Sequence, residues 1–303
     1  MNIDFKNPYF PLGDPFLFYH EGKYYLYGTT EIHEKLINLN DFKTSETEED
    51  GIFVYTSSDL INWKNEGYCL KMGDVIGEKW FWAPEVTYYN GKFYMAYSAE
   101  EHMAIAVADS PLGPFKQEEK KFLREAPGID GHIFIDDDGT KYFYHVGFND
   151  GNRIYVAKLS DDLLSITEEC GELIKAEEPW ETVDCLVAEG PFVLKKKGIY
   201  YLSYSCNHTR NPAYAVGYAT SNSPLGPFVK HKSNPILQRN NELWGVGHHA
   251  FCKIPNSDKY FCSFHCHTPN SDDFRPRYFC LTTAYFAEEN GETVLKIEKP
   301  KKA

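Results

Sequence analysis

The sequence lacks any hydrophobic run long enough to cross a bilayer, since no stretch reaches 18 consecutive apolar residues. Its first residues, MNIDFKNPYF, contain neither the basic segment nor the apolar segment that begins a secretory signal peptide. We therefore expect a cytoplasmic protein that has no membrane partner.

Positive charge is also scarce. The 303 residues include 31 Lys and Arg against 44 Asp and Glu, which gives a formal net charge of −13. The basic runs in the sequence are short, as at 195–197 and in the tail 299–302. Nucleic acids and anionic lipids repel such a surface, so we expect no nucleic-acid partner, and a neutral ligand fits better.

The eight cysteines are scattered and form no C-x-x-C motif. This pattern is not typical of a disulfide framework, and we expect reduced thiols that are mostly buried. Cys262, His265, Cys266 and His267 lie close together in the sequence, but their spacing fits no common zinc-ligand pattern.

Long helical periods are missing as well, and a repeat of β-type segments takes their place. Five alternating, aromatic-rich runs each follow a turn: GKYYLYG from Gly22, GKFYMAYS from Gly91, GTKYFYHV from Gly139, GIYYLSYS from Gly198 and SDKYFCSF from Ser257. An apolar run precedes each of them, as expected for a β-hairpin. Weaker repeats follow the hairpins, including two copies of SPLGPF.

Five repeated units of three to four strands predict an all-β fold, a five-bladed β-propeller, with residues 1–303 as one domain. A β-sandwich would not explain repetition at this period.

A polar residue stands near the start of the first strand in every repeat. Taking Tyr25, Tyr94, Phe143, Tyr201 and Phe261 as equivalent, these polar residues are Asp14, Glu85, Asp130, Glu189 and His248. First strands line the channel of a propeller, so we expect the five side chains to meet near the axis. Like charges in one concave site oppose folding. We therefore infer that a function is the reason for these residues.

Each residue also has a structural interpretation. Asp14 and Glu189 precede proline or Gly-Pro and could serve turns. Glu85 could accept structural hydrogen bonds, and His248 could be a buried histidine with satisfied partners. The shared position in the repeat is what favours a site.

Several carboxyl groups facing one pocket are what glycoside hydrolysis requires. One protonated acid gives a proton to the leaving oxygen, a second carboxylate activates water or attacks carbon, and a third can raise the acid's pKa. Aromatic residues near the strand starts could stack on sugar faces: Trp80, Phe81, Trp82, Phe148 and Trp244. As single residues, they are more often packing residues.

The motifs together resemble glycoside hydrolase family 43. They are GDPF at 13–16, WAPEV at 82–86, GIDGHIFIDDDG at 128–139, AEGPF at 188–192, GVGHHAF at 245–251 and SFHCH at 263–267, in order along nearly the whole chain. The related five-bladed fructosidases carry Arg-Asp-Pro and Glu-Cys motifs, and neither stands at the candidate residues here, since Asp130 follows Ile129 and Glu189 precedes Gly190.

This resemblance implies an inverting hydrolase acting on xylo- or arabino-oligosaccharides. It implies Asp14 as general base, Glu189 as general acid and Asp130 as the residue that tunes the acid. Substrate contacts are expected from Trp82, Glu85, Phe148, Arg277 and His249. His248 is expected to face a metal on the axis, often calcium with a water shell, and no organic cofactor is expected.

Two alternatives stay open at this point. A non-catalytic sugar-binding propeller would need the aromatic residues but not an acid and a base. A propeller hydrolase acting on fructans or galactans would keep the carboxyl groups and change the sugar.

Overall fold

A computed structural model of the chain describes residues 5–30, 51–269 and 273–302. Every regular element in these ranges is a strand, and none of them contains a helix that could span a membrane. The strands are β1 (Gly13–His20), β2 (Lys23–Thr29), β3 (Gly51–Ser57), β4 (Lys64–Lys71), β5 (Trp82–Tyr89), β6 (Lys92–Ala99), β7 (His102–Ala108), β8 (Gly128–Ile135), β9 (Lys141–Phe148), β10 (Asn152–Leu159), β11 (Ile166–Lys175), β12 (Ala188–Lys196), β13 (Ile199–Cys206), β14 (Ala215–Ser221), β15 (Val229–Lys230), β16 (Gly247–Lys253), β17 (Tyr260–Cys266), β18 (Tyr278–Glu289) and β19 (Glu292–Ile297).

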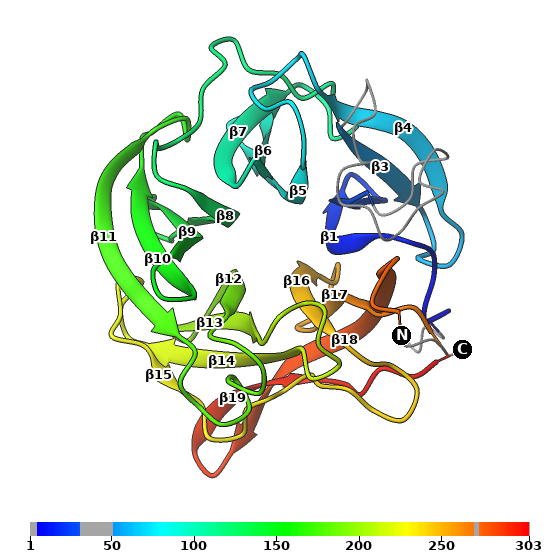
Figure 1. Cartoon of the computed structure of the whole chain (residues 1–303), viewed down its shortest axis with the longest axis vertical. Coiled ribbons are helices and arrows are strands. Elements are labelled where there is room, and N and C mark those ends of the chain that lie inside the picture. The colour runs from blue at the N-terminus through cyan, green and yellow to red at the C-terminus, as the bar shows by residue number, and fades with distance from the viewer. Residues whose placement is uncertain (1–4, 31–50, 270–272, 303) are drawn as a thin grey trace.

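The strands form five antiparallel sheets arranged around a central axis (Figure 1). Blades 1, 3, 4 and 5 have four strands each, β1–β4, β8–β11, β12–β15 and β16–β19, and blade 2 has the three strands β5–β7. The first strand of each blade, β1, β5, β8, β12 and β16, lies nearest the axis (Figure 1). The five-bladed β-propeller predicted from the repeats is confirmed.

In three blades the first hairpin has a two-residue turn, and the first hairpins of blades 3 and 5 have longer loops. Residues 21–22, 90–91 and 197–198 link the first two strands of blades 1, 2 and 4, and both residues of each turn have positive φ, with glycine second. This conformation matches the twist of paired strands and favours glycine. The glycine before the aromatic run in these three units is thus a turn signal.

The N-terminal segment closes the circle. The backbone N–H of Tyr9 donates to Phe279, and that of Leu12 donates to Arg277, so the segment before β1 lies along β18 of the last blade. Phe5 and Lys301, near the two ends of the described residues, line the same pocket.

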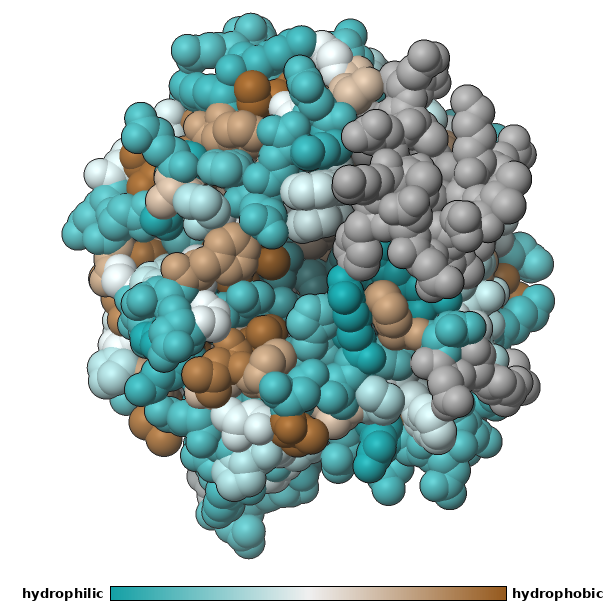
Figure 2. Space-filling view, viewed as in Figure 1, coloured by the Kyte–Doolittle hydropathy of each residue, from teal (hydrophilic) through white to brown (hydrophobic). Residues whose placement is uncertain are grey.

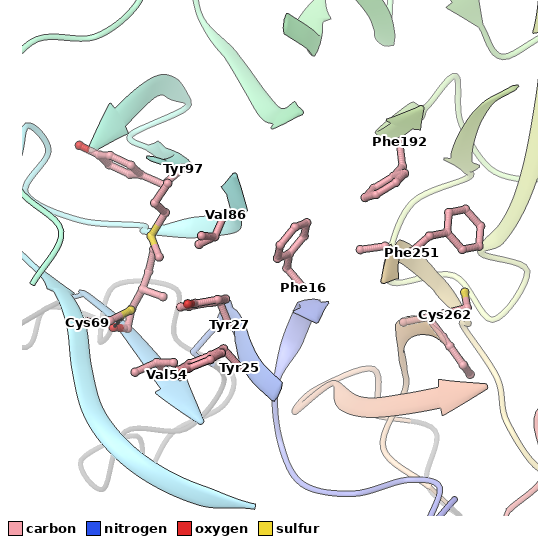
Figure 3. Packing of buried hydrophobic residues seen from close by; sticks show 14 of the residues in the cluster. Phe16, Tyr25, Tyr27, Val54, Cys69, Val86, Tyr97, Phe192, Phe251 and Cys262 are labelled. Carbon is pink, nitrogen blue, oxygen red and sulfur yellow. Dashed lines mark hydrogen bonds between the residues drawn. The ribbon is translucent and has the colours of Figure 1, made fainter. Parts of the chain in front are cut away.

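Apolar side chains fill the space between blades and below the channel mouth. Figure 3 shows Tyr27 and Cys69 of blade 1 facing Val86 and Tyr97 of blade 2. Near the axis Phe192 packs edge-on against Phe251, with centroids 5.5 Å apart. None of the eight cysteines forms a disulfide and six of them are buried, as the sequence predicted.

Candidate active site

The first strand of every blade carries a β-bulge close to its start, where the pairing register shifts. One residue inside each bulge has a positive φ. These five bulge positions are Asp14 (46°), Ala83 (44°), Asp130 (58°), Gly190 (56°) and His248 (46°). Bulges re-aim side chains, and positive φ outside glycine is strained and clusters at functional sites. The bulges place two aspartates and a histidine at equivalent points around the axis.

This register corrects the equivalence that the sequence suggested. Glu189 is the residue before the bulge position of its blade, and Glu85 lies two residues after Ala83. The hairpin loops differ in length. Counting back from the aromatic residues therefore matched side chains that do not occupy equivalent positions in the strands. Only three of the five polar residues are structurally equivalent.

Glu85 belongs to a second layer, one step further along the channel. Its Oε2 lies 2.6 Å from Nδ1 of His132, whose Nε2 accepts the N–H of Val193 at 3.1 Å. A ring that accepts at Nε2 carries its proton on Nδ1, so His132 donates to Glu85. The same layer holds Phe16, Phe192 and Ala250 in the other blades. Glu85 therefore makes the structural hydrogen bond that was its alternative interpretation.

Asp14 is buried and surrounded by donors. Its Oδ2 accepts from the Thr29 hydroxyl at 2.6 Å, and its Oδ1 accepts from Nη1 of Arg277 at 2.6 Å. Gly13 makes this contact possible, because a Cβ there would lie 2.2 Å from the Arg277 guanidinium. Nδ1 of His248 lies 3.3 Å from Oδ1.

These donors decide the ionisation of Asp14. Burial by itself raises the pKa of a carboxyl group, but Arg277 and then His248 hold the pKa of Asp14 well below its usual value. Burial and then Arg277 lower the pKa of His265 to about 3, so this ring is neutral and its Nδ1 can accept the Asp14 N–H at 3.3 Å. Asp14 is a carboxylate throughout the neutral range.

Glu189 is held in the opposite state. Its Oε1 contacts the Tyr214 hydroxyl at 2.9 Å and its Oε2 contacts the Asn152 amide at 3.0 Å. Burial, followed by the nearby charge of Asp130, raises the pKa of Glu189 to about 7. A good part of Glu189 is therefore protonated at neutral pH, as a proton donor requires.

Asp130 is the third carboxyl group of the site. Its Oδ2 accepts the N–H of Gly190 at 3.0 Å and is 3.9 Å from Nδ1 of His248. Burial raises the pKa of Asp130, and the charges of Asp14 and Glu85 act in the same direction, while His248 opposes them. Asp130 is thus the carboxyl group that contacts the backbone next to Glu189.

The expected substrate contacts fall into two groups. Half-buried Trp82 stacks on Trp80 with ring centroids 5.7 Å apart, and Phe148 is 42% exposed. Both offer an aromatic face. Figure 2 shows one face of the propeller, with a hollow at its centre and hydrophobic side chains beside the hollow over the third and fourth blades.

Arg277 and His249 are less available to a sugar. Arg277 is buried against Asp14, and the ring of His249 is buried with its Nε2 2.6 Å from the Ser203 hydroxyl. A sugar contact by His249 would need that ring to move.

With the geometry in place, comparison with known proteins is direct. The sequence profile described as glycosyl hydrolases family 43 matches residues 5–290. The chain belongs to glycosyl hydrolase family 43.

Relatives within family 43 carry several names. A crystal structure titled endo-1,4-beta-xylanase, from Bacteroides thetaiotaomicron, is 42% identical with a TM-score of 0.85, and the match covers 96% of this chain and 95% of that one. The beta-D-galactofuranosidase xynD of Aspergillus niger is 27% identical over 95% of this chain and 84% of its own. The xylosidase/arabinosidase 43A of Humicola insolens is 30% identical over 71% of this chain and 77% of its own. The chain spans under half the length of two matching arabinoxylan arabinofuranohydrolases.

Sequence reasoning missed three residues that contact the carboxyl groups of this family 43 site, and it weighed a fourth neighbour, His265, only as a zinc ligand. Thr29 ends β2, His265 lies in β17, Asn152 begins β10 and Tyr214 precedes β14. Their common signal is position: each stands at a strand end or in a strand near the face where the bulges lie. Their types alone gave no signal, because Thr, Asn and Tyr are common in strands and turns.

The calcium expected on the axis can be compared with the donors present. Nδ1 of His248 faces Asp14 and Asp130, which leaves Nε2 as the nitrogen for an ion. Within the described ranges, no three His, Cys, Asp or Glu side chains converge as metal ligands. One imidazole fits an ion held mostly through water, so His248 is the residue that would hold calcium, and the ion would offset the negative charge of the carboxyl groups.

Removing calcium gives a test of that fit. We expect a chelator to lower the Tm by about 2–4 °C, the shift for a loss of roughly 1 kcal/mol, and calcium add-back to restore it. His248→Asn should abolish this response. Unchanged melting temperature and activity with and without calcium would leave His248 as a hydrogen-bonding residue only.

Proposed function

We propose that the protein is an inverting glycoside hydrolase that releases xylose or arabinose from xylo- or arabino-oligosaccharides. The observation that carries the proposal is the split between two carboxyl groups, buried Asp14 and half-buried Glu189: the pKa of Asp14 is held well below its usual value, and that of Glu189 is raised to about 7. When the environments of two titratable groups push their pKa values apart, the group with the low pKa is the base and the group with the raised pKa is the acid.

In this mechanism Asp14 accepts a proton from the attacking water, and Glu189 gives its proton to the leaving oxygen. Thr29 and Arg277 fix the carboxylate of Asp14, and Asn152 and Tyr214 fix the carboxyl group of Glu189. Inversion needs room for water, so the two carboxyl groups should lie roughly 6.5–9.5 Å apart. Proton NMR of the first anomer released would test the stereochemistry, and a retained anomer would contradict it.

The choice of sugar draws on the relatives. One is named a xylosidase/arabinosidase and another is titled a xylanase, which supports pentosides. A third is named a beta-D-galactofuranosidase, which makes galactofuranosides the second candidate. The test is release of 4-nitrophenol from β-D-xyloside, α-L-arabinofuranoside and β-D-galactofuranoside. A propeller that only binds glycans would release none from any of the three.

Asp130 gives this proposal a pH signature. Glu189 must be protonated to act, so we expect kcat/KM to fall as pH rises through about 7. Asp130→Asn removes a negative neighbour that raises the pKa of Glu189, so the basic limb should move to lower pH by about one unit. The measurement is kcat/KM between pH 4 and 9.

Asp136→Asn is a matched control, because Asp136 is buried but bonds Lys195 and Tyr200 away from the site. A basic limb that stays in place in Asp130→Asn would remove Asp130 from its tuning role.

A further inference from the structure

The backbone N–H of each bulge position donates across to a neighbouring blade. In four cases the acceptor is a side chain on the second strand of the preceding blade, at the residue paired just before the bulge. The pairs are Ala83 to the Thr29 hydroxyl (2.9 Å), Asp130 to the Ser98 hydroxyl (3.1 Å), His248 to the Ser205 hydroxyl (2.9 Å) and Asp14 to Nδ1 of His265 (3.3 Å). The pattern therefore runs around the propeller, one acceptor per blade junction.

The junction between blades 3 and 4 breaks the pattern. In β9 the residue paired just before the bulge is Val146, opposite Ile129, where the other blades have Thr, Ser or His. Valine has no acceptor and Val146 is fully buried. The N–H of Gly190, the bulge position of blade 4, donates instead to Oδ2 of Asp130 at 3.0 Å.

This exception lies next to Glu189, the proposed acid. The Gly190 N–H belongs to the peptide that joins it to Glu189, so the bond ties Asp130 directly to the backbone carrying the acid. The charged groups that interact with Asp130 are His248 from β16, Asp14 from β1, Glu85 from β5 and Glu189 from β12. Among these, none supplies a backbone donor to Asp130.

We propose that Val146 is a positioning residue of the active site: because it offers no acceptor, it leaves the Gly190 N–H to Asp130 and so fixes the acid-bearing Glu189–Gly190 peptide against that carboxylate. The inference rests on the proposed role of Glu189. The position of the Glu189–Gly190 peptide then depends on the absence of a side-chain hydroxyl at Val146 as well as on the presence of Asp130.

The test is Val146→Thr, which keeps the volume and adds an acceptor where Thr29, Ser98 and Ser205 have one. We expect a crystal structure to show the Gly190 N–H bonded to the new hydroxyl and Asp130 released. On the sugar that the wild type cleaves, kcat for a disaccharide should fall about tenfold, whereas kcat for a 2,4-dinitrophenyl glycoside should change less than about twofold, because the poor leaving group depends on the acid.

Val156→Thr is the matched control, since Val156 is equally buried in the same core cluster on β10. It should lower the Tm as any unsatisfied buried hydroxyl does, and it should leave the ratio of the two kcat values unchanged. If Val146→Thr does not fold, Val146→Ser offers the same acceptor in a smaller side chain.

A Gly190 to Asp130 bond that persists in the variant, or equal losses on both substrates, would overturn the proposal. Failure of the proposed function is a separate result: a wild type without activity on any glycoside would show it, while the crystal structure would still report whether the hydrogen bond had moved.

Discussion

Asp14→Asn should lower kcat by about 10²- to 10⁴-fold on every glycoside that the wild type cleaves, whatever its leaving group. The reason is that water must lose a proton in the transition state and an amide cannot accept it. The side chain should stay in place, because the amide oxygen can still accept from Arg277 and the amide nitrogen can donate to the Thr29 hydroxyl oxygen. Steady-state kinetics on an activated and an unactivated substrate is the measurement.

This change also removes the charge partner of a buried arginine, which destabilises folded proteins by several kcal/mol. The Tm of Asp14→Asn must therefore be measured beside its kcat. Asp136→Asn supplies the comparison, since it removes another buried carboxylate that bonds Lys195 and Tyr200 and should keep wild-type kcat. Activity of folded Asp14→Asn near the wild-type level would exclude Asp14 as the base.

Glu189→Gln should divide substrates by their leaving groups. We expect a loss of about 10²- to 10⁴-fold on disaccharides, whose leaving oxygen needs a proton, and a much smaller loss on 2,4-dinitrophenyl glycosides, whose leaving group departs as an anion. The fall in rate as pH rises through about 7 should disappear as well, because the group whose pKa lies there is gone.

Glu85→Gln is the matched control for this experiment. It removes a carboxylate from the second layer of the same channel, where Glu85 bonds His132. Its effect should be the same on both kinds of substrate. If Glu189→Gln also lost activity equally on both, Glu189 would be a binding or structural residue and another group would have to supply the proton.

The fold could be predicted from the sequence because the signals for its hairpins are local. A turn glycine followed by an alternating aromatic run marks a hairpin wherever it occurs, as at residues 22–28 and 198–205. Five such units in a row leave few ways to bury their apolar faces except side by side around an axis. Asp14, Asp130, Glu189 and His248 could be selected for the same reason, since each stands near the start of such a unit.

The roles of these residues depend on contacts between distant parts of the chain. Arg277 reaches Asp14 from 263 positions away, and Gly190 donates to Asp130 across 60. Ionisation depends on burial and on charges a few ångströms away, neither of which a single sequence displays. The bulge register likewise follows from hydrogen bonds between strands, so the sequence could not show that Glu85 lies in the second layer.

The sequence by itself therefore determined the repeat, the β-type of its units and the set of carboxyl groups, because turn chemistry and alternation act between near neighbours. The tertiary structure alone decided which carboxyl group stays ionised beside Arg277 and which holds its proton beside Asp130. The physical reason is that pKa values are set by electrostatic interactions and desolvation, which depend on distances through space and not on separation along the chain.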